Sequence, residues 1–161
     1  MSAASSPFSH CLVPPADAAG RMTADVAISG GGMVGLALGI GFAMHGLDTI
    51  VVDAAEPAAG LEDAFDGRAS AIAYASYRLL DGLGIWPYLA ADASPINEIR
   101  VSDGPSHFFL HFDHREIGDS PLGFMVENRH MRRALAARAD SLADELAAVW
   151  IARHGIVVGS W

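Results

Sequence analysis

The sequence has few cysteines and few basic residues. Cys11 is the one cysteine among 161 residues, which excludes an internal disulfide and any zinc or iron–sulfur site built from several cysteines. Lys and Arg number 10 against 19 Asp and Glu, so the formal net charge is −9. This charge argues against nucleic acid as a partner and against electrostatic docking on anionic lipid. A cytoplasmic location fits the low cysteine content.

Charged residues are also absent from Val26 to Leu47, a length sufficient to cross a bilayer. Against a membrane helix, this stretch contains Gly30, Gly31 and Gly32 in a row, and adjacent glycines are unfavourable inside a helix. No cluster of Lys and Arg flanks it. No transmembrane segment is therefore predicted, and a membrane span is kept as the alternative.

The same stretch has the pattern of a strand, a turn and a helix. Val26–Ile28 is a short apolar run, typical of a buried parallel strand. Gly30, Gly32 and Gly35 follow at the G-x-G-x-x-G spacing. The first glycine permits a tight turn, the second lets a pyrophosphate approach the backbone, and the third allows close packing of the helix. The free N–H groups and the positive end of the helix dipole then face the phosphates.

The sequence after this turn completes a mononucleotide-binding unit. A helix is predicted from Met33 to Gly46, and Thr49–Val52 is a second strand that ends at Asp53. Asp53 lies 23 residues after Gly30, close to the spacing of about 20 residues at which an acidic residue binds a ribose hydroxyl. The alternatives are that Asp53 is only a turn residue at the end of the strand, and that Glu56 binds the ribose instead. The predicted fold class is α/β, a Rossmann-like domain with a βαβ unit.

The remaining segments are predicted from apolar patterns and turn residues. Residues 1–23 are expected to form a disordered lead, with Met22 as the natural start, and residues 24–161 to form one domain. Further elements are expected at Ser70 to Leu83 (helix), Ile96 to Val101, His107 to Phe112 and Gly123 to Val126 (strands), Asn128 to Ala148 (helix), and within Gly155 to Trp161 (strand). No metal site is predicted, and a solvated hairpin accounts for His107, His111 and His114.

Four separated segments resemble the flavoprotein aromatic hydroxylases of the para-hydroxybenzoate hydroxylase superfamily, and within it the ubiquinone-biosynthesis hydroxylases. They are Asp25–Gly35, Ile50–Asp53, Asp66–Ala73 and Val126–Leu135. The run Leu79–Trp86 is similar to the same branch. The resemblance covers residues 24–135. The Asp-Gly-Arg run at the start of the third segment is its most specific part, because many dinucleotide enzymes share the first segment.

The resemblance implies FAD at the turn formed by Gly30, Gly31 and Gly32 (the glycine turn), NAD(P)H as the co-substrate that reduces it, and hydroxylation of an aromatic ring. The implied substrate is a polyprenylated phenol on the route to ubiquinone, and the implied setting is a ubiquinone-biosynthesis complex peripheral to the inner membrane. Arg68 would neutralise the pyrophosphate and Asn128 would contact FAD; a solvated charge and a helix N-cap are the respective alternatives. The candidate cofactor-binding residues are Gly30, Gly31, Gly32, Met33, Val34, Gly35, Asp53, Arg68 and Asn128. No catalytic side chain is identified.

The sequence also departs from the resembled family. Family members are longer and carry a second flavin motif, similar to Gly-Asp-Ala-Ala-His, and a substrate-binding sheet that this sequence lacks. Asp53 stands where the family more often has Glu, which preserves the acceptor. We therefore expect an incomplete version of a larger two-domain flavoprotein, from a truncated or frame-shifted gene, that is inactive alone. The alternatives are an NAD-dependent or flavin-reducing Rossmann oxidoreductase and an inactive nucleotide-binding fragment.

Overall fold

The glycine turn joins the first strand and the first helix of a parallel sheet. β1 (Val26–Ser29), α1 (Met33–Met44) and β2 (Thr49–Asp53) follow one another along the chain, and β1 pairs in parallel with β2 over its whole length. β8 (Val149–Arg153) pairs in parallel along the other side of β2. The predicted α/β fold and its βαβ unit are confirmed.

The computed structural model describes residues 23–54, 66–104, 108–146 and 149–153. Apart from Thr23, the predicted disordered lead therefore lies outside the described residues. Glu56, His107 and the strand predicted within residues 155–161 lie outside them too. β8 occupies residues 149–153, where the sequence analysis expected no strand.

β1 is an edge strand within the described residues, where it pairs with β2 alone. The Gly30 N–H group donates to the Val52 carbonyl at 2.7 Å. Neighbouring residues of a strand direct their backbone groups to opposite sides, so the backbone groups of Ala27 and Ser29 point away from β2. The strand that precedes the glycine turn is therefore held from one side.

A second sheet contains three antiparallel strands in the order β3–β7–β4. They are β3 (Ala69–Ala73), β4 (Ser94–Ile96) and β7 (Gly123–Glu127). The helix predicted from Ser70 is wrong in its first part, because α2 begins only at Tyr74 and ends at Gly82. Exposed and half-buried residues alternate along β3, and its pairing with β7 outweighs the helix preference of its alanines.

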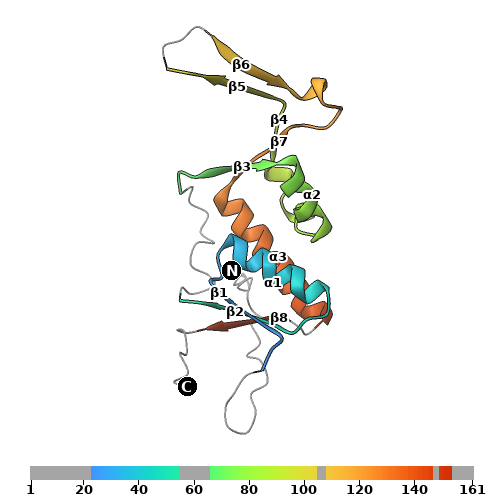
Figure 1. Cartoon of the computed structure of the whole chain (residues 1–161). Helices are drawn as coiled ribbons and strands as arrows, with labels where there is room; N and C mark the ends of the chain where they lie inside the picture. Colours follow the sequence, from blue (N-terminus) through green and yellow to red (C-terminus); the bar gives the residue numbers. More distant parts are fainter. Residues whose placement is uncertain (1–22, 55–65, 105–107, 147–148, 154–161) are drawn as a thin grey trace, which may run out of the picture.

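β5 (Glu98–Ser102) and β6 (Phe109–Asp113) form a two-stranded antiparallel hairpin, close to two of the predicted strands. Figure 1 shows this hairpin at the far end of the molecule from the parallel sheet. One face of the hairpin carries four apolar side chains that are 42–64% exposed: Ile99, Val101, Leu110 and Phe112. A two-stranded ribbon is marginally stable in water unless its apolar face packs against further structure, and these exposed side chains lack most of that packing.

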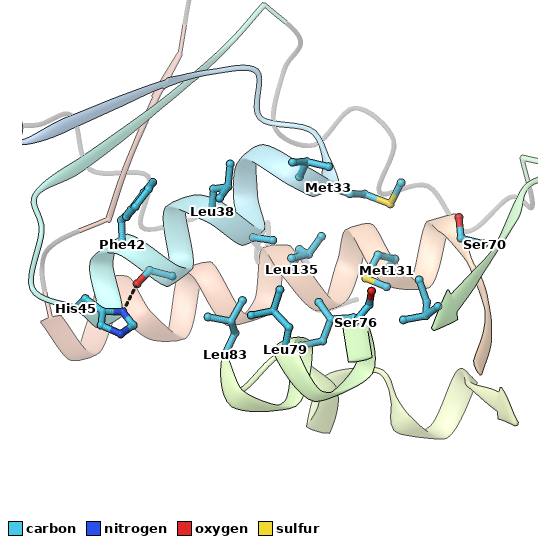
Figure 2. A pocket seen from close by; sticks show the side chains of 15 residues that line it. Met33, Leu38, Phe42, His45, Ser70, Ser76, Leu79, Leu83, Met131 and Leu135 are labelled. Atoms are coloured by element: carbon cyan, nitrogen blue, oxygen red, sulfur yellow. Dashed lines mark hydrogen bonds between the residues drawn. The ribbon is translucent and has the colours of Figure 1, made fainter. Parts of the chain in front are cut away.

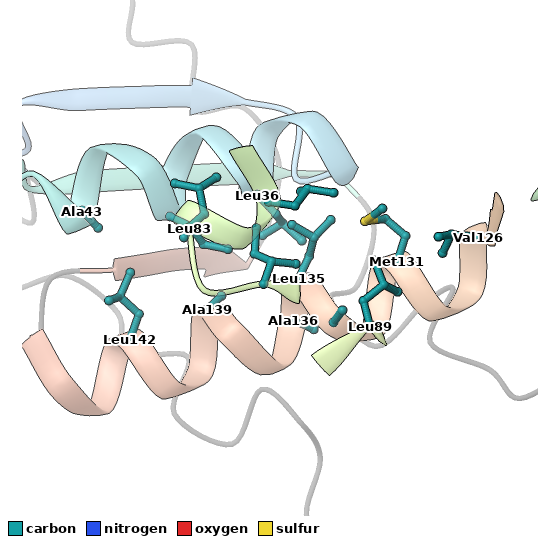
Figure 3. Close-up of a cluster of buried hydrophobic side chains, with 14 residues drawn as sticks. Leu36, Ala43, Leu83, Leu89, Val126, Met131, Leu135, Ala136, Ala139 and Leu142 are labelled. Atoms are coloured by element: carbon teal, nitrogen blue, oxygen red, sulfur yellow. The ribbon is translucent and has the colours of Figure 1, made fainter. Parts of the chain in front are cut away.

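The hydrophobic core lies between α1, α2 and α3 (Asn128–Leu146), with the 3-10 turns η1 (Trp86–Tyr88) and η2 (Ala90–Asp92) closing one side. Figure 1 shows α1 and α3 side by side on the parallel sheet, and Figure 3 shows their side chains meeting those of the α2–η1 segment. The largest fully buried apolar side chains are those of Ile40, Ile85, Leu89, Leu135, Leu142, Val51 and Val126.

The uncharged stretch from Val26 to Leu47 forms β1, the glycine turn and a helix of 12 residues. The alternative of one long membrane helix over this stretch is therefore wrong. Within the ranges that the structure describes, no helix combines the length and the hydropathy that crossing a bilayer requires.

Candidate functional site

Gly30 and Gly35 are in close contact where β1 turns into α1. Gly30 has a φ of +105°, a backbone conformation that residues with a Cβ atom rarely adopt. A Cβ atom at Gly35 would lie 1.8 Å from the Gly30 carbonyl oxygen, and a Cβ atom at Gly39 would lie 2.8 Å from Val51 Cγ2. Gly30 is thus required by the turn, and Gly35 and Gly39 by the packing of α1.

The first turn of α1 is an open site for an anion. Gly32 is the N-cap residue and offers no side-chain cap, and the first turn holds no acidic residue. Leu36 N–H donates to the Gly32 carbonyl at 2.9 Å. The N–H groups of Met33, Val34 and Gly35 precede this bond and have no partner within the helix. A Cβ atom at Gly32 would meet nothing within 4 Å. The backbone therefore offers donors, a positive dipole end and space for a pyrophosphate.

Asp53 lies directly against the glycine turn. The Gly31 N–H group donates to Asp53 Oδ2 at 2.5 Å, and a Cβ atom at Gly31 would lie 3.0 Å from Asp53 Cβ. The end of β2 thus brings a half-buried carboxylate to the turn, at the place that the sequence spacing predicts. A carboxylate at this place is suited to accept a hydrogen bond from a ribose hydroxyl.

Asp66, Gly67 and Arg68 form a tight turn that precedes β3. Gly67 has a φ of +77°, and Arg68 N–H donates to Asp66 Oδ1 at 3.0 Å. Arg132 Nη2 on α3 donates to Asp66 Oδ2 at 2.6 Å, and this bond is the largest cause that lowers the pKa of the Asp66 carboxyl. The exposed Arg68 side chain forms no hydrogen bond or ion pair with the described residues, which leaves its guanidinium available to a ligand.

Asn128 lies at the start of α3, beside the Asp66–Arg68 turn. Its N–H group donates to the Arg68 carbonyl at 3.1 Å. Its side-chain Oδ1 accepts a hydrogen bond from Ser70 Oγ at 2.7 Å, and the residue is buried. These two bonds tie α3 to β3 and place Asn128 next to Arg68.

Met33, at the start of α1, and Ser70, in β3, lie at the same end of an apolar groove (Figure 2). Met33 and Val34 line this groove at the start of α1, and Ser70 lines it from β3. The groove has a volume of about 620 Å³ and continues between α1, α2 and α3 as far as His45. Its lining contains no Asp, Glu, Lys or Arg. Phosphate groups therefore fit at the glycine turn and not along the groove.

Sequence reasoning missed Ser70 and Arg132 and did not assign a role to Asp66. Arg132 follows Asn128 by four residues, and residues four apart share one face of a helix. This spacing was the signal that would have placed Arg132 beside the candidate Asn128. The contacts of Ser70 and Asp66 depend on pairings between segments about 60 residues apart, which no local pattern indicates.

Two of the three histidines assigned to a solvated hairpin lie within the described residues, His111 in β6 and His114 in a turn. His111 Nε2 in β6 lies 3.3 Å from Glu98 Oε2 in β5, and His114 begins the turn η3 (His114–Glu116). His107 lies outside the described residues. Over the described ranges, no group of three or more His, Cys, Asp or Glu side chains is arranged to hold a metal ion.

Known proteins match this chain over most of its length. Residues 23–142 match the family described as FAD binding domain. Ubiquinone hydroxylase UbiL of Rhodospirillum rubrum is 44% identical over 128 residues, which are 80% of this chain and 30% of that protein. The 3-demethoxyubiquinol 3-hydroxylase of Escherichia coli is 41% identical over 113 residues, which are 69% of this chain and 29% of that protein. The chain thus spans about 30% of the length of these curated relatives.

A solved structure shows the same fold. The crystal structure of pqsL, a probable FAD-dependent monooxygenase from Pseudomonas aeruginosa, aligns with a TM-score of 0.58 at 20% identity. The alignment covers 80% of this chain and 32% of the other. At this identity the likeness concerns the fold alone.

Proposed function

Because this chain belongs to the FAD binding domain family, we propose that it binds FAD at the glycine turn as part of a flavin-dependent monooxygenase. The family resemblance drawn from the sequence is confirmed by the matched family and relatives. The observation that carries the proposed site is the first turn of α1, which has unpaired N–H groups and open space at Gly32. This combination suits an anion, and the pyrophosphate is the anionic part of FAD.

The residues around this turn fit FAD by their chemistry. The N–H groups of Met33–Gly35 would hold the pyrophosphate, with Gly30, Gly31 and Gly32 allowing its approach. Asp53 would accept a hydrogen bond from the ribose of the adenosine half. The exposed Arg68 guanidinium would neutralise the pyrophosphate charge with its fork of donors. Asn128 would contact the cofactor from the start of α3. All of these groups bind and orient FAD.

When bound, FAD would supply the redox chemistry that hydroxylates an aromatic ring, with NAD(P)H as the source of electrons. We propose a polyprenylated phenol of ubiquinone biosynthesis as the substrate. The names of the two curated relatives, a ubiquinone hydroxylase and a 3-demethoxyubiquinol 3-hydroxylase, support this substrate class. We also propose that the protein acts at the periphery of the inner membrane, within a ubiquinone-biosynthesis complex.

The FAD content of the full chain tests the proposed site. The purified chain is incubated with excess FAD, free FAD is removed, and flavin absorbance is compared with protein concentration. We expect about one FAD per chain for the wild type and a loss of FAD in Gly32→Val, whose side chain fills the space for the pyrophosphate. Gly82→Val at the end of α2 is the matched control, because a Cβ atom there also meets nothing within 4 Å.

A parallel titration with ADP and NADH separates the alternatives. Binding of ADP without retention of FAD would favour an inactive nucleotide-binding fragment. Binding of NADH in place of FAD would favour a Rossmann oxidoreductase of another kind. A folded chain that binds none of these ligands would contradict the site at the glycine turn.

A further inference from the structure

The turn formed by Asp66–Arg68 is fixed to α3 at two points. Arg132 Nη2 donates to Asp66 Oδ2 at 2.6 Å, and Asn128 N–H donates to the Arg68 carbonyl at 3.1 Å. Between these points, Arg68 N–H donates to Asp66 Oδ1 at 3.0 Å. One carboxylate thus connects Arg132 to the backbone of Arg68.

We propose that Arg132 is a positioning residue for FAD binding, because it fixes, through Asp66, the backbone from which Arg68 reaches the cofactor. This inference rests on the proposed function. It assigns a role to a residue that lies outside the set of candidate cofactor ligands.

The contact of the Arg68 guanidinium with a ligand depends on a fixed position of the Arg68 backbone. It is long, exposed and without a hydrogen-bond partner among the described residues, so its guanidinium samples many rotamers. Gly67, at a φ of +77°, adds a residue of high backbone freedom directly before it. Without the bond from Arg132 to Asp66, the turn would move more and the Arg68 guanidinium would sample a larger volume. Its contact with a pyrophosphate would then be weaker, because more conformational freedom is lost on binding.

The Asp66–Arg132 pair is suited to hold this turn. The two side chains are 29% and 27% exposed, so the pair is partly shielded from water and interacts more strongly than a fully exposed pair. The hydrogen bond from Arg132 lowers the pKa of the Asp66 carboxyl, which keeps it charged. Because Arg132 donates to Asp66 whereas Arg68 has no such acceptor, we infer that Arg68 meets the cofactor and Arg132 acts through the turn.

A double-mutant cycle on the full chain tests this role. The dissociation constant for FAD is measured by quenching of flavin fluorescence in the wild type, Arg68→Ala, Arg132→Ala and the double variant. We expect each single variant to weaken FAD binding about tenfold. The double variant should bind FAD about as weakly as Arg68→Ala, because Arg132 acts through Arg68. Arg78→Ala removes the same charge from an exposed position on α2 and should leave affinity unchanged.

Two conservative variants separate positioning from a general loss of structure. Arg132→Lys keeps a charged donor toward Asp66 and should recover most of the affinity. Asp66→Asn keeps an oxygen that can accept from Arg68 N–H but loses the charge, and it should reproduce the effect of Arg132→Ala. Thermal melts without ligand show whether each variant is folded.

The outcomes distinguish this inference from the proposed function. If the wild type binds FAD and Arg132→Ala binds it equally well, the positioning role is wrong and the FAD site stands. Fully additive effects in the double variant would also overturn it, because the two arginines would then act independently. A wild-type chain that binds no FAD would overturn the proposed function, and the positioning role with it.

Discussion

One methyl group added at Gly35 should destabilise the chain, whereas the same group added at Gly32 should remove dinucleotide binding without loss of stability. In Gly35→Ala the new Cβ atom would lie 1.8 Å from the Gly30 carbonyl oxygen, where ordinary contact begins at 3.4 Å. The obstacle is backbone, so no rotamer change relieves it. In Gly32→Ala the new Cβ atom meets nothing within 4 Å.

The magnitudes follow from these contacts. Overpacking costs about 1–3 kcal/mol and sometimes more, and a backbone overlap at 1.8 Å belongs at or above the upper end. The better helix propensity of Ala returns about 1 kcal/mol, so Gly35→Ala should lose about 2 kcal/mol or more, or about 4–8 °C in Tm for a chain of this size. For Gly32→Ala, the weaker N-cap and the lower entropy of the unfolded chain nearly cancel, which leaves a change within about 0.5 kcal/mol.

Two measurements on the full chain check this pair. Thermal melts followed by circular dichroism, without ligand, report stability, and flavin absorbance after removal of free FAD reports binding. Gly82→Ala on α2 is the control, with open space for its Cβ atom and no contact with the site. A Gly35→Ala chain that melts with the wild type would refute the close contact of α1 with the turn. A Gly32→Ala chain that retains FAD would refute the approach of the pyrophosphate to that residue.

Three further variants test other parts of the structure. Asp53→Asn keeps an oxygen for the Gly31 N–H but loses the charge, so a fluorescence titration should show about tenfold weaker FAD binding; unchanged affinity would contradict the ribose contact. The pKa of Asp113 is lowered from its ordinary value of 3.8, first of all by the Arg115 side chain. The carboxylate therefore adds stability above that value, which is lost as pH falls toward the lowered pKa, and urea unfolding of Asp113→Asn and wild type should differ at neutral pH and converge in acid. Leu135 is 1% exposed, so Leu135→Ala should lower the free energy of unfolding by about 2–5 kcal/mol in urea, and a loss below about 1 kcal/mol would contradict its place in the core.

Sequence reasoning succeeded where the physical requirement is local. The glycine spacing, the apolar run before it and the acid at Asp53 lie within one βαβ unit, so their contacts follow from the geometry of a strand, a turn and a helix. The long helix from Asn128 was predicted for the same reason, from its own apolar spacing and N-terminal residue. These elements do not depend on distant partners for their type.

The errors lie where a distant partner decides the structure. The alanine-rich run Ser70–Ala73 is predicted as helix, but it belongs to β3, whose pairing with β7, at least 50 residues away, makes it a strand. β8 forms at residues 149–153 through its pairing with β2. Arg132 donates to Asp66, which lies 66 residues before it in the chain. The contact of Arg132 therefore depends on the folded arrangement of two segments that show no common motif.

Within the described residues β1 is an edge strand, and this position affects how readily the strand opens locally. The N–H groups of Ala27 and Ser29 point away from β2, so they can exchange hydrogen with solvent while β1 stays paired. Their hydrogen-exchange rates should therefore be high for a parallel strand. Opening of this edge would displace Gly30 and with it the whole anion site. A dinucleotide that binds only the closed turn would slow these openings, and part of its binding energy would be spent on ordering the edge. If the glycine turn binds a dinucleotide as proposed, its affinity would depend partly on how often β1 is already paired with β2.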